Sequence, residues 1–285
     1  MNNTLPDLEK TMLKWCAEAA EVAHRHFKQT GALEFKYARE AVTRADRDIE
    51  MLISRRIQAA FPEDAIFGEE FGPTQAGQIT GRNAAAGAAG DAPAATDLGG
   101  GRIWHLDPID GTLNFALGLP NFCTSLALMD GDEILAACVF APLHREGYTA
   151  SLGGGTRLNG EAVQVSERGA LSEAIISAQL QKGGRYVQKP GLLQAILLKT
   201  MKMRRLGTIA LEMAYLAAGR YDAMIAGRGR PQQLYDVAAG ILLVREAGGE
   251  VTDHLGKVYR PYTTDLVASN GLVHGELIDL IAEHE

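Results

Sequence analysis

The sequence predicts a layered α/β protein, in which helices pack on mixed β-sheets. Amphipathic helical patterns occur in the region 5–60, strand patterns dominate the middle of the chain, and the second half alternates strand patterns with helical ones. The chain has 285 residues, of which 46% are hydrophobic and 22% charged, so it can bury a large core. This length suits one large domain or two tightly joined ones.

The first two helices and one short strand are predicted by spacing. Apolar side chains recur at helical spacing from about residue 5 to 30, where Gly31 supplies a stop. A second helical pattern covers 46–60 and ends at a Phe-Pro pair. The strand-like segment 65–67 then leads into the acidic stretch Gly68-Glu69-Glu70.

Residues 71–103 form the main irregular stretch. They are rich in Gly and Ala and have almost no large apolar side chains to anchor them, which predicts a surface loop. Two interpretations stay open: a tolerated insertion, which we favour, or a lid over the acidic residues on either side of it.

The middle of the chain predicts a strand that ends in acidic residues, followed by a hairpin. Segment 103–106 is strand-like and leads directly into Asp107. The strand-like runs 124–129 and 134–140 are joined by Asp130-Gly131-Asp132, which is a hairpin signal.

The second half alternates the two kinds of pattern. Strands are predicted at 174–178 and 223–226, and helices at 192–199, 209–218 and 237–247. Asp236 precedes the last of these helices, where its simplest structural role is an N-cap. No linker marks a domain boundary, so we infer one compact unit with an N-terminal half, 1–150, and a C-terminal half, 151–285.

Composition disfavours several classes of protein. A formal net charge of −7 argues against nucleic acid as a partner, because nucleic-acid binders carry a concentrated positive surface. The three cysteines, Cys16, Cys123 and Cys138, lack the spacing of a metal site and the density of a disulfide framework, which indicates reduced structural thiols. The N-terminus lacks a signal-peptide pattern, and no apolar run approaches the roughly 20 residues that span a bilayer. We therefore expect a cytoplasmic protein without a membrane partner.

The chemistry is concentrated around two aspartates. Asp107 and Asp110 lie three residues apart across a Pro-Ile pair, where both carboxylates can converge on one cation. Gly111 allows close backbone approach, and Thr112 offers a hydroxyl and an amide at a predicted helix start. Hydrolysis of a phosphate ester needs this mixture, because Mg²⁺ prefers oxygen ligands and neutralises charge on the attacking and leaving oxygens. The alternative is an ordinary turn without a ligand.

Short motifs occur in a specific order along nearly the whole chain. They are Val42-Thr43 with Asp46, Gly68-Glu69-Glu70, Asp107-Pro108-Ile109-Asp110-Gly111-Thr112-Leu113-Asn114-Phe115, Gly153-Gly154-Gly155-Thr156 with Asn159-Gly160, Gly207-Thr208, and Asp236-Val237-Ala238-Ala239-Gly240. With these motifs the chain resembles the inositol monophosphatase family, within the superfamily of lithium-sensitive, metal-dependent sugar phosphatases. The resemblance implies alternating helix and sheet layers in an αβαβα sandwich, and a homodimer.

The resemblance also implies a role for each motif residue. Two or three Mg²⁺ ions would be held by four carboxylates and one carbonyl: Glu69, Asp107, Asp110, Asp236 and the carbonyl of Ile109. The attacking water would be positioned and activated by Asp46, Thr112 and Glu69, with the Thr112 hydroxyl relaying a proton. The substrate would be contacted by Gly111, Thr112, Gly207, Thr208 and Asp236. A helix cap is the structural alternative for Asp46.

Two departures from the family pattern bear on the substrate. Tyr235 stands where the family usually has Trp, and it is another aromatic that can pack similarly. The inositol phosphatases that the chain resembles carry a glutamate near Ala226 that contacts substrate hydroxyls, whereas no carboxylate lies between Ala226 and Tyr235. Arg228 and Arg230 either contact an extra anionic group of the substrate or are solvated loop arginines.

The sequence therefore predicts a magnesium-dependent phosphomonoester hydrolase that acts on a small phosphorylated metabolite through direct attack of metal-activated water. Inositol 1-phosphate is the default substrate, and histidinol phosphate, fructose 1,6-bisphosphate and 3'-phosphoadenosine 5'-phosphate are alternatives. A hypothesis of another class is a non-catalytic regulatory protein that binds metal and phosphate. The presence of all the motif carboxylates argues against that second hypothesis.

Overall fold

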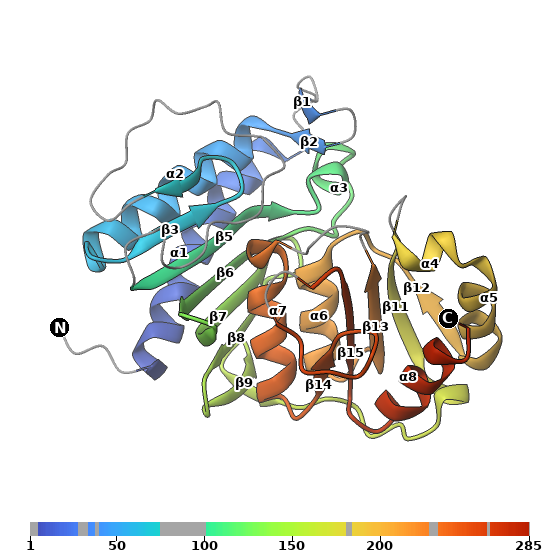
Figure 1. Ribbon diagram of the computed structural model, residues 1–285. Helices are drawn as coiled ribbons and strands as arrows, with labels where there is room; N and C mark the ends of the chain where they lie inside the picture. Colours follow the sequence, from blue (N-terminus) through green and yellow to red (C-terminus); the bar gives the residue numbers. More distant parts are fainter. Residues whose placement is uncertain are drawn as a thin grey trace.

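The computed structural model describes residues 5–27, 34–37, 40–74, 101–180, 184–227, 233–260 and 263–284. Its elements form five layers, helix, sheet, helix, sheet and helix, which confirms the predicted αβαβα sandwich (Figure 1). The outer helices on one side are α1 (Leu5–His26) and α2 (Arg44–Ala60), and the central helices are α6 (Ile209–Ala217) and α7 (Leu234–Glu246). The other outer layer contains α4 (Arg185–Gln188), α5 (Pro190–Lys199) and α8 (His274–Ala282).

The first sheet has eight strands in the order β10-β9-β8-β7-β6-β5-β3-β4. Their bounds are β3 Ala65–Gly68, β4 Gly72–Thr74, β5 Arg102–Asp110, β6 Cys123–Asp130, β7 Glu133–Ala141, β8 Glu146–Ser151, β9 Gly155–Leu158 and β10 Glu161–Val163. Only β3 and β5 are paired in parallel in this sheet, so their carboxyl ends lie at the same edge. A separate ribbon pairs β1 (Glu34–Tyr37) with β2 (Glu40–Val42).

The second sheet has five strands in the order β12-β11-β13-β15-β14. Their bounds are β11 Ile175–Leu180, β12 Lys202–Arg204, β13 Ala223–Gly227, β14 Glu250–Thr252 and β15 Asp265–Ser269. Strand β11 runs parallel to both of its neighbours, and β15 runs antiparallel to both of its own. Two short helical segments complete the description, α3 (Thr112–Ala116) and a 3₁₀ turn at Leu171–Glu173.

Local chemistry explains where α2 begins and ends. The backbone N–H of Thr43, the residue before the helix, donates to Oδ2 of Asp46 at 2.8 Å. A side chain in the first turn thus accepts the hydrogen bond that this N–H would otherwise lack. Ile49, Ile53 and Ile57 repeat every four residues and are fully buried against the first sheet. The helix stops at Ala60, because a residue that precedes proline disfavours the helical conformation.

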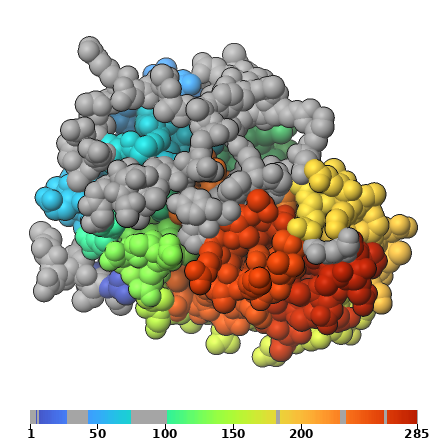
Figure 2. Space-filling model, in the orientation of Figure 1, coloured from blue at the N-terminus to red at the C-terminus, as the bar shows by residue number. Residues whose placement is uncertain are grey.

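The central helices are apolar on nearly all sides because both sheets cover them. One hydrophobic core joins β6–β8 of the first sheet, α6 and α7, and β13 and β15 of the second. Within it, α7 approaches α6 so closely that a Cβ on Gly240 would lie 2.6 Å from Sδ of Met213. Figure 2 shows the green part of the N-terminal half and the orange part of the C-terminal half side by side on one face. The central layer therefore fixes the position of the α7 N-terminus relative to β5.

Most predicted elements are confirmed, and three of their bounds differ from the prediction by three residues or more. The first helix ends at His26 rather than near residue 30, and α7 begins at Leu234, so Asp236 lies in its first turn and is not an N-cap. Strand β5 continues through Asp110 instead of ending before Asp107. Of the predicted loop 71–103, residues 75–100 lie outside the described residues.

The division into halves at residue 150 stays a prediction, and the first sheet runs on to Val163. No helix within the described segments has the length and apolar character that crossing a membrane requires.

Candidate active site

The parallel pair β3 and β5 brings two acidic residues to one edge of the first sheet. Gly68, the last residue of β3, pairs with Leu106 of β5, and the amide of Glu69 donates to the Leu106 carbonyl at 3.1 Å. Glu69 and Asp107 therefore follow directly after paired positions on adjacent strands. The side chain of Glu69 contributes to the raised pKa of Asp107 through its charge and through hydrogen bonding, after the larger effect of burial, which places the two carboxyl groups close together.

A bulge in β5 explains how Asp107 and Asp110 serve one site. Side chains alternate faces along a regular strand, so residues three apart point to opposite sides. Here the pairs Asp107 with Ser125 and Asp110 with Cys123 enclose one more residue on β5 than on β6. This irregularity restores a common direction for both carboxylates. Pro108 lies within the bulge, where its missing N–H costs no ladder hydrogen bond.

Asp107 is the least exposed acid of the group. It is 2% exposed, and burial raises the pKa of its carboxyl well above the usual range, with further raising by the charges of Glu69, Asp110 and Asp236. Its Oδ1 is buried without a hydrogen-bond partner among the described residues. A buried carboxylate oxygen without a donor is costly unless a cation binds it.

Asp110 links the bulge to the central helices. Burial, together with the smaller effect of the Asp236 charge, raises the pKa of its carboxyl to about 7. The amides of Ile209 and Ala210 donate to Oδ1 and Oδ2 at 3.2 and 2.7 Å and oppose that rise. Asp110 therefore binds the first amides of α6 and still belongs electrostatically to the carboxylate group.

Asp236 reaches the group from the second half of the chain. It lies in the first turn of α7, is 8% exposed, and raises the pKa values of Asp107 and Asp110 through its charge. The preceding residue, Tyr235, stacks on Phe67 of β3 with ring centroids 5.8 Å apart. Its packing thus docks the start of α7 on the strand that leads to Glu69, and an aromatic residue suffices for that contact.

Asp46 and Thr112 meet beside this group. Asp46 is fully buried on α2, and the Thr112 hydroxyl lies 3.4 Å from its Oδ1. The same hydroxyl lies 3.0 Å from the carbonyl oxygen of Ile109, to which it also donates. The structure therefore places the three residues within one short hydrogen-bonded chain, while their roles stay predictions.

Gly111, which follows Asp110, packs against the side chain of Thr208. Gly111 has φ +94°, and a Cβ there would overlap the side chain of Thr208, so only glycine fits. Asn114 holds the two segments together, because its Nδ2 donates to the Leu206 carbonyl at 2.8 Å. Gly207, with φ +83°, lies between these anchors. Oγ1 of Thr208 is buried without a hydrogen-bond partner among the described residues.

Glu212, which the sequence patterns did not single out, supports this segment from within α6. Its side chain is fully buried, Oε1 accepts hydrogen bonds from the Leu206 amide at 2.9 Å and the Ser177 hydroxyl at 2.8 Å, and Gln179 donates to Oε2. Burial raises the pKa of its carboxyl. A lone acid in an otherwise apolar helix was the signal in the sequence.

The carboxylate group has the chemistry of a magnesium site. It presents only oxygen ligands, which Mg²⁺ prefers, and one of them, Oδ1 of Asp107, accepts no hydrogen bond from the described residues. Within the described ranges, no three His, Cys, Asp or Glu side chains already converge at ligand distances. Since like charges repel, a bound cation is what would draw them together. Arg228 and Arg230, predicted to contact substrate, lie outside the described residues.

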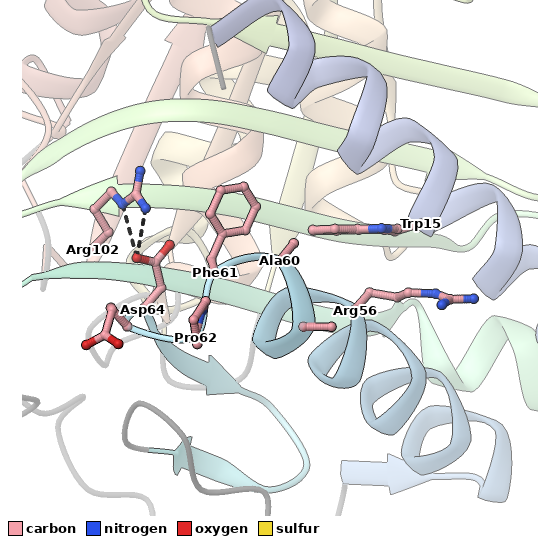
Figure 3. Close-up of a pocket in the computed structure, with 9 residues that line it drawn as sticks. Trp15, Arg56, Ala60, Phe61, Pro62, Asp64 and Arg102 are labelled. Carbon is pink, nitrogen blue, oxygen red and sulfur yellow. Dashed lines mark hydrogen bonds and ion pairs between the residues drawn. The ribbon is translucent and has the colours of Figure 1, made fainter. Parts of the chain in front are cut away.

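A surface cavity lies at the other end of β5, and its lining is aromatic and basic as well as acidic (Figure 3). Its lining includes Arg56, Phe61, Asp64 and Arg102. Arg102 begins β5, eight residues before Asp110, which is roughly 25 Å along a strand. Both arginines that line the cavity form ion pairs, Arg102 with Asp64 at 3.0 Å and Arg56 with Glu18 at 2.8 Å. The cavity is therefore separate from the carboxylate group.

A family model described as the inositol monophosphatase family matches residues 5–285. The chain belongs to the inositol monophosphatase family. It is 35% identical over 246 residues to the fructose-1,6-bisphosphatase/inositol-1-monophosphatase of Thermotoga maritima, covering 86% of this chain and 84% of that one. It is 32% identical over 281 residues to the Nus factor SuhB of Pseudomonas aeruginosa, covering 95% and 94%.

Solved structures agree with this membership. The inositol monophosphatase of Thermotoga maritima superposes with a TM-score of 0.80 at 33% identity, covering 97% of each chain. The extragenic suppressor protein SuhB of Bartonella henselae gives 0.84 at 27% identity, covering 98% of this chain and 99% of that one. Membership in the family indicates a phosphatase.

Proposed function

We propose that this protein is a magnesium-dependent phosphatase that hydrolyses the phosphate monoester of a small polar metabolite. The observation that carries the proposal is the group of four carboxylates, three buried and Glu69 half-buried, in which Oδ1 of Asp107 has no hydrogen-bond partner among the described residues. Burying mutually repelling acids is unfavourable for an apo protein, and a divalent cation removes that cost.

In this proposal the cation is held by Glu69, Asp107, Asp110, Asp236 and the carbonyl of Ile109. When bound, Mg²⁺ neutralises charge on the phosphoryl oxygens and lowers the pKa of a coordinated water, with two or three ions sharing these tasks. Three of these carboxylates, those of Asp107, Asp110 and Asp236, are at most 8% exposed, so bulk water screens their charges only weakly.

The hydroxyl of Thr112 is the proposed proton relay for direct attack of water on phosphorus. It donates toward Asp46 or the Ile109 carbonyl, which leaves its lone pairs to accept a hydrogen bond from the incoming water. Asp46 is well placed to hold the proton, because the Thr43 amide already orients its carboxylate. Glu69, hydrogen-bonded to Asp107, is the second candidate base.

Phosphate oxygens are proposed to meet the backbone on the other side of the carboxylates. The amides of Gly111 and Thr112 start α3, and Gly207 and Thr208 pack beside them. Because α3 has only five residues, its dipole is short and the cation provides most of the attraction.

Inositol monophosphate is the substrate that we propose to test first. One relative, from Rhizobium meliloti, is named inositol-1-monophosphatase and is 35% identical over 256 residues, while the Thermotoga relative's name adds fructose 1,6-bisphosphate. A second phosphate is the group that the predicted role of Arg228 and Arg230 would recognise. Histidinol phosphate and 3'-phosphoadenosine 5'-phosphate complete the alternatives. We also propose that the protein is a homodimer, which sedimentation analysis tests. We further propose that it is cytoplasmic, which cell fractionation tests.

A substrate panel decides between hydrolysis and binding. We expect selective phosphate release from one class among inositol, sugar, histidinol and nucleotide phosphates in Mg²⁺, and none in excess EDTA. Because several relatives are named Nus factor SuhB, a non-catalytic role is the second candidate. Metal binding without release from any substrate would favour that candidate, and release that persists in EDTA would contradict the metal dependence.

The relay role of Thr112 makes a separate prediction. Thr112→Val removes the hydroxyl but keeps the shape, and we expect kcat to fall by about 10²- to 10⁴-fold with little change in Mg²⁺ affinity or unfolding temperature. Thr112→Ser should retain most of kcat. Thr200→Val is the matched control, because that hydroxyl also donates to a backbone carbonyl, at 2.8 Å, but at the end of α5. Wild-type kcat in Thr112→Val would exclude the relay.

A further inference from the structure

The turn between β3 and β4 is held by a buried carboxylate that none of the roles above uses. Glu50 lies on α2, one helical turn after Asp46, and is 1% exposed. Its Oε2 accepts a hydrogen bond from the amide of Glu70 at 2.8 Å, and its Oε1 accepts one from the amide of Phe71 at 2.9 Å. Both oxygens are thus engaged by consecutive backbone donors of one turn.

The end of β3 is shaped to admit this carboxylate. A Cβ on Gly68 would overlap the carboxyl group of Glu50, so residue 68 must lack a side chain while Glu50 occupies its place. Gly68 has no positive φ, and its requirement is therefore steric rather than conformational. Glu50 and Gly68 form a matched pair, in which the glycine leaves the room that the carboxylate fills.

Glu69 is the residue that this arrangement encloses. Its own amide donates to the Leu106 carbonyl of β5 at 3.1 Å, and the next two amides donate to Glu50. Three successive backbone donors are therefore anchored, one to the sheet and two to α2. The Glu69 side chain extends from this anchored backbone to the carboxyl of Asp107.

We propose that Glu50 is a positioning residue, which holds the turn 69–71 so that Glu69 presents its carboxylate to a divalent cation beside Asp107. The inference rests on the proposed function, because it names the residue that preorganises one side of that metal site. Groups that orient metal ligands typically contribute about 10- to 100-fold to metal affinity, although they do not touch the metal.

Mg²⁺ affinity, measured calorimetrically on the full chain, tests the inference. We expect Glu50→Gln to weaken binding by about 10- to 100-fold, because an amide nitrogen would then face a backbone N–H donor. Gly68→Ala should also weaken Mg²⁺ binding, although it removes no charge, because the added methyl group displaces the Glu50 carboxylate. Glu50→Asp retains the acceptor on a shorter stem and should lie between wild type and Glu50→Gln.

Glu246→Gln is the matched control for a purely structural role. Glu246 also uses its two oxygens to accept backbone amides, those of Gly153 at 2.8 Å and Gly155 at 2.9 Å. It lies ten residues beyond Asp236 on α7, about 15 Å along the helix. We expect this variant to lower the unfolding temperature in EDTA while leaving Mg²⁺ affinity unchanged.

The outcomes separate the two proposals. Wild-type Mg²⁺ affinity in Glu50→Gln, with an EDTA unfolding temperature shifted as in Glu246→Gln, would overturn the positioning role. If Glu50→Gln does not fold, Gly68→Ala decides in the same way. Failure of the proposed function appears in wild type itself, as metal binding without phosphate release, and leaves the Glu50 inference standing. A wild-type chain that binds no Mg²⁺ would overturn both.

Discussion

Replacing Asp107 by Asn is expected to abolish Mg²⁺-dependent phosphate release, by at least about a thousandfold, without destabilising the metal-free protein. The loss follows because a direct ligand disappears, and several kcal/mol of charge stabilisation corresponds to a thousandfold in rate. Stability is retained because Asn is a neutral group of the same shape, whereas Asp107 is buried among Glu69, Asp110 and Asp236. Activity and stability should therefore respond in different directions.

Thermal unfolding in EDTA and in Mg²⁺ measures both effects of Asp107→Asn. We expect its unfolding temperature in EDTA to equal or exceed that of wild type. Mg²⁺ at 100 times the wild-type Kd should stabilise wild type by about 2.7 kcal/mol and the variant hardly at all. A lower unfolding temperature in EDTA, together with a normal response to Mg²⁺, would show that Asp107 is structural.

Asp222→Asn is the contrasting buried acid. Asp222 is fully buried, and its carboxylate accepts hydrogen bonds from the Arg168 guanidinium at 2.8 Å and the Ile175 amide at 2.7 Å. Removing a charge that already has partners leaves Arg168 unpaired, so this variant should unfold at a lower temperature with or without Mg²⁺. Comparing Asp107→Asn with Asp222→Asn distinguishes a buried acid that binds a metal ion from one that forms an ion pair within the protein.

The second large effect is a pH dependence of stability that the binding of Mg²⁺ opposes. The pKa of Asp110 is raised to about 7 from its ordinary value of 3.8, so the folded chain binds the proton more tightly than the unfolded chain. Between those values the folded state carries more protons, and the free energy of unfolding in EDTA should fall as pH rises from about 4 to 7. For Asp110 alone the fall is on the order of 4 kcal/mol. The raised pKa of Asp107 acts in the same direction.

Mg²⁺ binds the deprotonated carboxylates, so the stabilisation that it adds should grow over the same range of pH. Urea unfolding between pH 5.5 and 8.5, in EDTA and in Mg²⁺, checks both slopes. Asp110→Asn should flatten the slope in EDTA, whereas Glu246→Gln should shift the curve without changing its slope. Equal slopes in wild type and Asp110→Asn would mean that Asp110 does not hold its proton near neutral pH.

The acidic residues can be singled out from the sequence because they carry local signals. Asp107, Asp110, Gly111 and Thr112 are contiguous, and Asp46 lies at a recognisable helix start. The structure brings Thr112 to 3.4 Å from Asp46 and places Asp236 in electrostatic contact with both β5 aspartates. These placements are consistent with the predicted roles, which the variants above test.

Other features depend on contacts between distant segments. The register shift opposite Cys123 and Ser125 makes the odd spacing of Asp107 and Asp110 productive, and no residue in β5 alone indicates it. In the sequence, Glu50 is one of several polar residues on a predicted helix. Its role is visible only in the folded chain, where the amide of Glu70 donates to its carboxylate. Helix α7 begins three residues before its predicted start, because Tyr235 joins the helix and stacks on Phe67.

By itself, the sequence determined the layered α/β class, the family and the residue types available for chemistry, because periodicity and contiguous motifs are local properties of the chain. Only the tertiary structure decided which acids share one low-dielectric site and which groups hold them in place. Those outcomes depend on strand register and on helices packed between two sheets, and therefore on residues far apart in the sequence.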